Sequence, residues 1–287
     1  MRVLITGGFG QLGFALYDAL SKIDQYDIIR TGRTIPNGQE GITLDIQNQV
    51  YLKEVVHSTK PDIIINLAAM TNVDACEKYP ELAGEINVAG LQHICDSFSG
   101  KIIQLSTDYV FNGKCGPYTE EDHVCPISIY GKTKLASERI LLENNANNLV
   151  VRGNVLYDDS PHTKASFLNW VISSLNGNQE IKVVEDQFNN PTWTRSMADI
   201  IELSIANDLS GIIHWGDADH INRFDFAIKI AEKFSLDASL IKPILTEDLK
   251  QIAPRPLQSG LVTTRLVKIL DVVPPSINDC LDEIKKS

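Results

Sequence analysis

A glycine-rich turn directly after the first strand is the feature that most constrains the fold of this chain. Residues 3–5 (Val-Leu-Ile) predict a short buried strand, and the turn precedes an apolar-periodic helix. This order forms a phosphate cradle, because backbone N–H groups face the anion and glycines let it approach closely. The glycine spacing, Gly-x-x-Gly-x-x-Gly, differs from the standard Gly-x-Gly-x-x-Gly fingerprint. We predict a dinucleotide site formed by Gly7, Gly10, Gln11, Leu12 and Gly13.

Strands and helices alternate along the first 155 residues. Further strands are predicted near residues 27–29, 44–46, 62–67, 101–106 and 150–152, with helices such as 49–58 and 80–98 between them. This order indicates right-handed βαβ units and a parallel sheet that binds ligands at the carboxyl ends of its strands. We therefore predict an α/β protein with a Rossmann-type, doubly wound parallel sheet.

The region after residue 155 departs from the simple alternation. A helix from 161 to about 175, a strand at 181–184, amphipathic helices at 224–234 and 246–252, and a terminal helix at 277–284 are predicted there. A helix at 197–206 and a strand at 211–214 return to the first unit. We predict a Rossmann domain of residues 1–155 with the returning segment 192–222, and a smaller C-terminal substrate-binding domain of residues 156–191 and 223–287.

Side chains after the second strand bear on the choice of cofactor. An acidic residue about twenty positions beyond the glycine turn would bind a ribose 2′-hydroxyl and favour NAD, whereas an arginine suits the 2′-phosphate of NADP. Arg33, with Arg30 as a second candidate, therefore favours NADP(H), while NAD(H) stays open because Arg33 has the alternative of being an ordinary loop arginine. Farther along the chain, Asp45 is placed to accept a bond from the adenine amine. The remaining predicted cofactor contacts are Ile46, Ala68 and Ala69.

A phenol and an amine four residues apart supply candidate catalytic groups. Tyr130 and Lys134 share one face of a predicted helix, and Thr107 follows the fifth strand. A carbonyl that receives hydride becomes an alkoxide, which a phenol can protonate while a lysine stabilises the phenolate. Thr107, or the neighbouring Ser106, can hydrogen-bond the same oxyanion. Tyr-x-x-x-Lys also occurs by chance on surface helices, so the pattern depends on its context.

The charge balance and the cysteines limit the other function classes. A net charge of −11 and a pI near 5.0 argue against nucleic acid as a partner. No signal peptide and no apolar run long enough for a membrane are expected, and the five cysteines lack Cys-x-x-Cys spacing. We expect a cytoplasmic protein with free thiols, no membrane partner and no metal site, and the one alternative for the thiols is that Cys115 and Cys125, which flank one loop, meet.

The chain resembles the extended short-chain dehydrogenase/reductases in five motifs, which are Gly7-x-x-Gly10-x-x-Gly13, Asn66-Leu-Ala-Ala69, Asn87-Val-Ala-Gly90, Ser106-Thr-Asp108 and Tyr130-x-x-x-Lys134. Within that superfamily the chain is most similar to the dTDP-4-dehydrorhamnose reductase family, and all these motifs together run between residues 3 and 261 in the order of that family. The motifs of the subfamily are Thr71-Asn-Val-Asp-Ala-Cys-Glu77, Ser106-Thr-Asp-Tyr-Val-Phe111, Tyr130-Gly-Lys-Thr-Lys-Leu-Ala-Ser-Glu138, Asp186-Gln-x-x-x-Pro191-Thr192 and Arg255-Pro-x-x-Ser259-x-Leu261.

This resemblance implies roles for particular residues. Thr107, Tyr130 and Lys134 take catalytic positions, and Lys134 also holds the nicotinamide ribose. The substrate would be a nucleotide sugar, whose pocket is lined by Val73, Asp108 and Tyr109. Apart from the resemblance, Arg255 is the candidate cation for the substrate diphosphate because its guanidinium suits phosphate, and an ordinary surface arginine is the alternative. Dehydratases related to the family have a glutamate where this chain has Tyr109, so reduction of a 4-keto group fits better than dehydration. A homodimer is one assembly that the resemblance implies.

One departure from the family keeps two other functions open. The run R-T-S-W that usually follows the sixth strand is Arg152-Gly-Asn-Val155 in this chain, which removes an aromatic wall of the sugar site. The primary prediction is NADPH-dependent reduction of dTDP-4-dehydro-L-rhamnose to dTDP-L-rhamnose. The alternatives are an NADP-binding protein similar to the regulatory subunit of methionine adenosyltransferase, and a reductase or epimerase of another nucleotide sugar. His214 is expected to be a structural residue.

Overall fold

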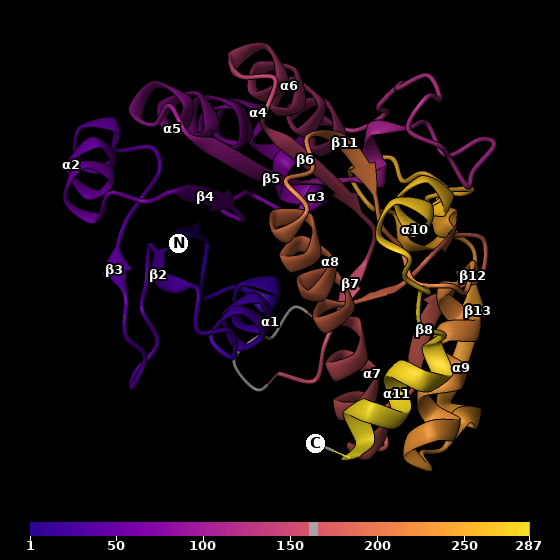
Figure 1. The fold of residues 1–287 in the computed structure, drawn as a ribbon. Helices are drawn as coiled ribbons and strands as arrows, with labels where there is room; N and C mark the ends of the chain where they lie inside the picture. Colours follow the sequence, from indigo (N-terminus) through magenta and orange to yellow (C-terminus); the bar gives the residue numbers. More distant parts are fainter. Residues whose placement is uncertain (161–165, 287) are drawn as a thin grey trace.

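A seven-stranded parallel sheet forms the centre of the molecule in the computed structural model, which describes residues 1–160 and 166–286 (Figure 1). The strand order is β11-β6-β5-β4-β1-β2-β3, so the chain runs from β1 to one edge and then continues on the other side of β1. This reversal between β1 and β4 creates the crevice where doubly wound sheets bind ligands. The predicted α/β class is confirmed. The strands are β1 (Arg2–Thr6), β2 (Asp27–Gly32), β3 (Ile42–Thr43), β4 (Ile63–Asn66), β5 (Lys101–Thr107), β6 (Leu149–Gly153) and β11 (Gly211–His214).

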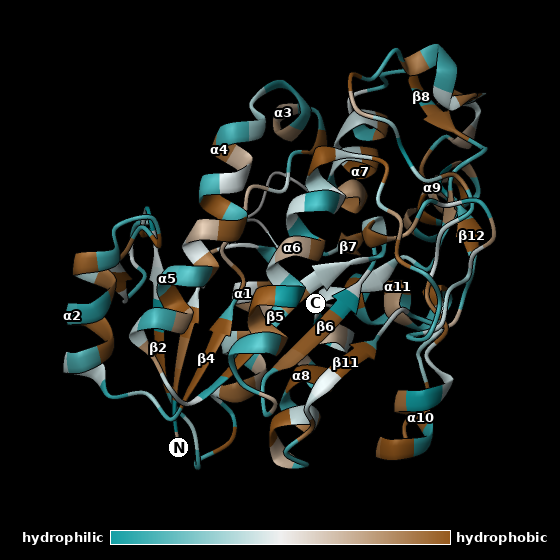
Figure 2. Cartoon of the chain, turned by 90° about the horizontal axis from the view of Figure 1, so that it is seen from above, coloured by the Kyte–Doolittle hydropathy of each residue, from teal (hydrophilic) through white to brown (hydrophobic). Residues whose placement is uncertain are grey.

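Helices cover both faces of this sheet because its strands are apolar on both faces. Successive residues of a strand point to opposite sides, and accordingly Val3 and Ile5 belong to one core cluster and Leu4 to another. The first face is covered by α1 (Gln11–Leu20) and α8 (Thr194–Ala206). The second face is covered by α2 (Gln49–Thr59), α5 (Gly90–Ser97) and α6 (Ile129–Asn144). The hydropathy colouring of Figure 2 shows the apolar strands between these helices.

The helix predicted for residues 80–98 is divided into three parts. They are α4 (Pro80–Gly84), a π-helical turn (Glu85–Ala89) and α5, and they follow the short helix α3 (Val73–Lys78). Asn87 in the π-helical turn accepts a hydrogen bond from the Met70 amide at 2.7 Å and donates to the Met70 carbonyl at 3.2 Å. The Ser137 hydroxyl donates to the Asn87 carbonyl at 2.6 Å. These bonds fix the loop after β4 against α6. The sequence predicted an unbroken α-helix and therefore did not predict these bonds.

The C-terminal part of the chain builds a second apolar core. Tyr157, Val171, Phe226 and Leu281 are buried members of this cluster. Its larger elements are α7 (Phe167–Asn176), β8 (Ile181–Val184), α9 (Arg223–Phe234), β13 (Ile241–Ile244) and α11 (Ile277–Lys286). Short paired strands complete it: β7 (Leu156–Tyr157) with β10 (Thr192–Trp193), and β9 (Phe188–Asn189) with β12 (Ile221–Asn222).

Two predictions for the C-terminal region differ from the structure. The helix predicted at residues 246–252 is a single 3₁₀ turn (Thr246–Leu249), because Lys250 follows it with a φ of +48°. An additional helix, α10 (Thr264–Leu270), buries Leu266 in the core of the parallel sheet and not in the second core. The division of the chain into two domains stays a prediction.

Two further sequence expectations concern helices and thiols. Within the described ranges, no helix combines the length and the apolar character needed to cross a membrane. All five cysteines are free thiols, with Cys115 and Cys125 exposed and the others buried.

Candidate active site

A cavity of about 950 Å³ lies at the carboxyl ends of the parallel strands and continues to the C-terminal unit. Most of the predicted site residues line it, although they come from segments more than a hundred residues apart. Those residues are Gly7, Gly10, Gln11, Leu12, Gly13, Arg33, Asp45, Ile46, Ala68, Ala69, Val73, Thr107, Asp108, Tyr109 and Tyr130. The other two, Lys134 and Arg255, are not among the lining residues.

The three glycines of the first turn are required for different structural reasons. Gly7 has a φ of +67°, and an added Cβ would lie 2.8 Å from the Ala68 nitrogen. A Cβ on Gly13 would lie 2.6 Å from the Gly8 carbonyl carbon, so the start of α1 packs directly on the turn. A Cβ on Gly10 would meet only the Gly7 oxygen, at 3.3 Å. Gly7 and Gly13 thus serve backbone packing, whereas Gly10 leaves the cavity surface open to a ligand.

The two candidate arginines for a 2′-phosphate occupy different environments. Arg33 is exposed at the cavity rim. Arg30 is buried, with its guanidinium carbon 3.8 Å from the ring centre of Tyr17 and 4.8 Å from that of Phe9. Its Nη2 donates to Gln39 Oε1 at 2.9 Å. Arg30 therefore supports the turn from behind, and Arg33 alone of the two reaches the cavity.

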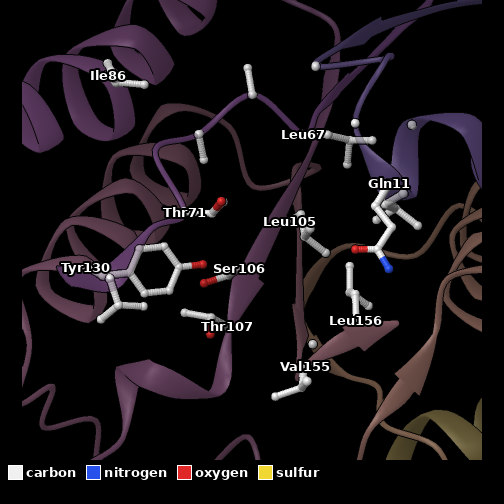
Figure 3. A pocket seen from close by; sticks show the side chains of 18 of the residues that line it. Gln11, Leu67, Thr71, Ile86, Leu105, Ser106, Thr107, Tyr130, Val155 and Leu156 are labelled. Carbon is white, nitrogen blue, oxygen red and sulfur yellow. The ribbon is translucent and has the colours of Figure 1, made fainter. Parts of the chain in front are cut away.

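Tyr130 presents its phenol to the cavity beside the end of β5. The side chain of Ser128 caps α6 by accepting a bond from the Gly131 amide, which places Tyr130 in the first turn of the helix. Figure 3 shows the Tyr130 hydroxyl pointing toward Ser106 and Thr107. Burial raises the pKa of Tyr130, and the charge of Asp108 raises it further, against a hydrogen bond with Thr107 that lowers it. The phenol is therefore protonated at neutral pH.

Lys134 lies behind Tyr130 and outside the cavity wall. Its side chain is buried, and Nζ donates to the Leu105 carbonyl at 2.6 Å. Burial lowers the pKa of Lys134 to about 8, while the nearby carboxylate of Glu138 acts in the opposite direction. The ammonium group remains mostly charged at neutral pH and lies one helical turn from the phenol.

A buried ion pair fixes the back of the site. Arg152 on β6 donates to Glu138 on α6 at 2.9 and 2.7 Å, and the Ser106 hydroxyl donates to the same carboxylate at 2.5 Å. His214 contacts Arg152 at 3.2 Å and the Tyr118 carbonyl at 3.1 Å. Burial, followed by the charge of Arg152, lowers the pKa of His214 to about 3, so its ring is neutral. This agrees with the structural role expected for His214; the Glu138–Arg152 pair was not predicted.

The predicted substrate residues form the far wall. Asp108 is buried and accepts hydrogen bonds from Ser259 Oγ at 2.5 Å and from Thr107 Oγ1 at 3.1 Å. Burial raises the pKa of Asp108. Arg255, the predicted diphosphate cation, instead pairs with Asp74 at 3.1 Å and donates to the Ala253 carbonyl at 3.1 Å.

Several cavity residues were not found from the sequence. The altered segment after β6 contributes Gly153, Asn154 and Val155, while Arg152 itself points into the ion pair with Glu138. The start of α7 adds two aromatic rings, and α9 adds an arginine. For the aromatic rings of α7, the available sequence signal was the tryptophan at position 170 of an apolar helix, which the structure shows to be exposed. The other unpredicted lining residues are Gly32, Leu44, Gln47, Leu67, Thr71, Ile86, Leu105, Leu156, Ser166, Phe167, Trp170 and Arg223, whereas Ser106, the predicted alternative to Thr107, does line the cavity.

Comparison with known proteins gives the family. The model of the RmlD substrate binding domain family matches residues 1–287. The chain belongs to this family. A dTDP-4-dehydrorhamnose reductase of Aggregatibacter actinomycetemcomitans is 30% identical over 99% of this chain and 98% of that protein. A crystal structure of a dTDP-4-dehydrorhamnose reductase from Bacillus anthracis in complex with NADP is 31% identical, with a TM-score of 0.90, over 99% of this chain and 98% of that one.

A third relative has a different kind of name. Methionine adenosyltransferase 2 subunit beta of Xenopus laevis is 30% identical over 93% of this chain and 82% of that protein.

The predicted membership in the dTDP-4-dehydrorhamnose reductase family of extended short-chain dehydrogenase/reductases is confirmed. That family is a class of NAD(P)-dependent oxidoreductases. The open surface at Gly10 and the cation at Arg33 fit NADP(H) as the cofactor.

Proposed function

We propose that this chain uses NADPH to reduce the 4-keto group of a nucleotide-linked 6-deoxyhexose, converting dTDP-4-dehydro-L-rhamnose to dTDP-L-rhamnose. The observation that carries the proposal is the shared cavity: the Tyr130 phenol opens into the same space as the glycine turn. Membership in the reductase family and the reductase names of two relatives support it. The cytoplasmic location and the homodimer predicted from the sequence stay predictions.

The mechanism assigns each step to a residue of the site. Bound NADPH supplies the hydride for the sugar carbonyl carbon. The glycine turn would hold the diphosphate of the cofactor, and Arg33 would bind its 2′-phosphate. The small side chains of Ala68 and Ala69 would let the cofactor lie against them. Tyr130 donates its proton to the C4 oxygen of the sugar, and the oxygen becomes a hydroxyl.

The groups around Tyr130 make this proton transfer favourable. The Thr107 hydroxyl, which donates to Asp108 in this structure, would turn to donate a hydrogen bond to the same sugar oxygen while negative charge develops on it. The Lys134 ammonium stabilises the phenolate that remains, from its fixed position on the Leu105 carbonyl. Asp108 and Tyr109 would hold the sugar, and the aromatic rings of Phe167 and Trp170 supply apolar surface to the same cavity.

The Tyr130→Phe variant tests the proposal. We expect kcat to fall at least ~10²-fold, because the proton donor is lost, while the Kd for NADPH changes little. The assay is the loss of NADPH absorbance on addition of the keto-sugar nucleotide, with Kd taken from NADPH fluorescence. Unchanged turnover in Tyr130→Phe would refute the mechanism.

A second candidate function is regulatory binding to a partner enzyme. It is favoured by the relative named methionine adenosyltransferase 2 subunit beta and by the altered wall at Gly153, Asn154 and Val155. A panel of keto-sugar nucleotides with NADPH and NADH separates the candidates. Turnover with a 4-keto-6-deoxyhexose supports the reductase, turnover with another sugar supports a different specificity, and no turnover together with a co-purifying methionine adenosyltransferase supports the regulatory function.

A further inference from the structure

Two arginines line the cavity, and they lie at different strand ends. Arg33 follows β2, whereas Arg223 starts α9 and lines the cavity with Tyr109, which follows β5 and whose pKa burial raises and the Arg223 charge lowers. In the sheet order, β1 and β4 separate β2 from β5. Three strand spacings correspond to about 14 Å. The cavity therefore has separate cations near its dinucleotide end and near its substrate end.

The Arg223 side chain is held in place by neutral groups. Its Nε donates to Gln187 Oε1 at 3.2 Å, and its guanidinium carbon lies 5.6 Å from the ring centre of Phe167. Burial raises the pKa of the Tyr109 phenol, and the nearby charge of Arg223 acts in the opposite direction. In the described part of the chain, Arg223 forms no ion pair within 4.0 Å, and the acidic group on which its charge acts is the buried Asp108, whose pKa burial raises and Arg223 lowers. The charge of Arg223 is thus positioned without being neutralised by a salt bridge.

Gln187 is itself fixed by a buried polar connection. The Gln187 side chain is buried and donates from Nε2 to Thr246 Oγ1 at 2.9 Å. Thr246 in turn donates from its hydroxyl to Asp186 at 2.7 Å. Asp186 and Gln187 begin the polar turn that the sequence motif singled out, yet neither lines the cavity. The turn therefore acts on the cavity through Arg223.

Arg255 provides the contrast. It was the arginine predicted to bind the substrate diphosphate, and its charge also acts on Tyr109. However, its guanidinium forms a salt bridge with Asp74 and its side chain is buried behind the wall. An arginine that already has a carboxylate partner offers less to a second anion than one whose fork is free for bidentate binding.

We propose that Arg223, positioned by Gln187, is the residue that binds the diphosphate of the nucleotide-sugar substrate. Its guanidinium is planar and matches phosphate oxygens in geometry. The inference rests on the proposed function, because it assumes a nucleotide sugar in this cavity. The proposal assigns the diphosphate-binding role to Arg223 in place of Arg255. It also gives the turn at Asp186 and Gln187 the role of positioning Arg223.

Binding of dTDP to the full-length protein with NADP⁺ present tests the proposal by calorimetry. We expect Arg223→Ala to raise the Kd for dTDP at least ~10-fold, since a hydrogen-bonded charge is lost. Arg223→Lys should recover part of the affinity, because it keeps the charge and loses the bidentate fork. The matched control is Arg195→Ala, an exposed arginine of α8 outside the cavity, whose Kd should stay within ~2-fold of wild type.

Gln187→Ala tests the positioning role in the reductase assay. We expect it to raise KM for the nucleotide sugar several-fold with little change in kcat, whereas general damage to the fold would lower kcat and NADPH binding as well. Melting temperatures of all variants, measured with NADP⁺, identify any that fail to fold. If Arg223→Ala fails to fold, the Kd of Arg223→Lys for dTDP tests the assignment in its place.

Each outcome decides between the inference and the function on which it rests. Wild-type affinity for dTDP in Arg223→Ala, or a larger loss in Arg255→Ala, overturns the assignment and leaves the reductase proposal intact. Binding of dTDP that depends on Arg223, without oxidation of NADPH by any keto sugar, supports the assignment and refutes reduction. A wild-type protein that binds no dTDP refutes the dTDP-sugar substrate and the Arg223 assignment together.

Discussion

At the scale of single residues, the site separates the proton donor from the charge that supports it. Tyr130 faces the cavity, whereas Lys134 is buried behind it on the Leu105 carbonyl. Burial moves the pKa values of the two groups in opposite directions, upward for the phenol and downward for the amine. Loss of charge from Lys134 is therefore the first ionisation expected in this pair as pH rises.

This difference predicts the alkaline limb of the activity profile. We expect kcat to fall as pH increases through about 8, because Lys134 loses its proton there and no longer stabilises the phenolate. Below that pH the ammonium is charged and kcat should be level. In Lys134→Met, kcat should be lower and the inflection absent. An inflection that persists at the same pH in Lys134→Met would assign it to another group.

Arg33 sets the cofactor preference in our second residue-scale prediction. Arg33→Ala should raise the Kd for NADPH about 10-fold and leave that for NADH unchanged, because only NADPH carries the 2′-phosphate. Fluorescence titration of both cofactors measures this. Equal effects on NADPH and NADH would contradict the assignment of Arg33. Arg30→Ala is not a matched control, since Arg30 packs between aromatic rings and its removal affects the fold.

At the scale of elements, the glycine turn combines packing and binding in seven residues. Gly13→Ala should destabilise the protein, because its Cβ would approach backbone atoms of Gly8 to 2.6 Å. Gly10→Ala should unfold at nearly the wild-type urea concentration, and it should weaken NADPH binding because the new methyl group occupies the open surface. Urea denaturation and cofactor titration compare the two variants. A stable Gly13→Ala protein, or wild-type NADPH affinity in Gly10→Ala, would contradict this division.

The elements differ in how far the sequence predicted them. Most strands of the parallel sheet were predictable because they are short apolar runs in a chain that alternates strands with helices. The third strand is the exception, since it was predicted near residues 44–46 and lies at Ile42–Thr43. The π-helical turn around Asn87 was not, since it depends on hydrogen bonds to Met70 and Ser137 from distant segments. In the same way, the sequence marked Arg255 as a cation but contained no local signal that Asp74 would pair with it.

The candidate site follows the same division. Residues in sequence motifs, such as Gly10 and Thr107 after strands and Tyr130 at the start of α6, were predicted and line the cavity. Phe167, Trp170 and Arg223 come from helices of the C-terminal unit, whose placement over the sheet depends on tertiary packing. No periodicity or spacing within α7 or α9 encodes that placement.

At the scale of the whole molecule, Asp217 connects the two cores. It accepts hydrogen bonds from the Trp193 amide at 2.8 Å and from Ser196 Oγ at 2.7 Å, and Cys280 of α11 contacts it at 3.7 Å. Burial is the main cause that raises the pKa of Asp217 to about 7, against the hydrogen bonds that lower it. The folded protein thus holds a proton that the unfolded chain releases near pH ~4.

The stability of the protein should depend on pH through this proton. Because the pKa is raised on folding, the contribution of Asp217 is full below pH ~4 and is lost as pH rises through about 7. The free energy of unfolding of wild type, measured relative to Asp217→Asn, should therefore decrease between pH 5 and pH 8. Urea denaturation across this range measures the difference. A constant difference would show that Asp217 ionises normally.

The return of α8 to the first face of the sheet has a consequence for dissection of the protein. Met197, Ala198 and Ile201 of α8 pack in one cluster with Leu12 and Leu16 of α1. A fragment ending at residue 155 would expose this apolar surface of α1, and it would leave β6 as an unpaired edge strand because its partner β11 would be missing. Such a fragment should aggregate when expressed alone, so nucleotide-binding and sugar-binding halves cannot be exchanged between relatives by a single cut in the gene.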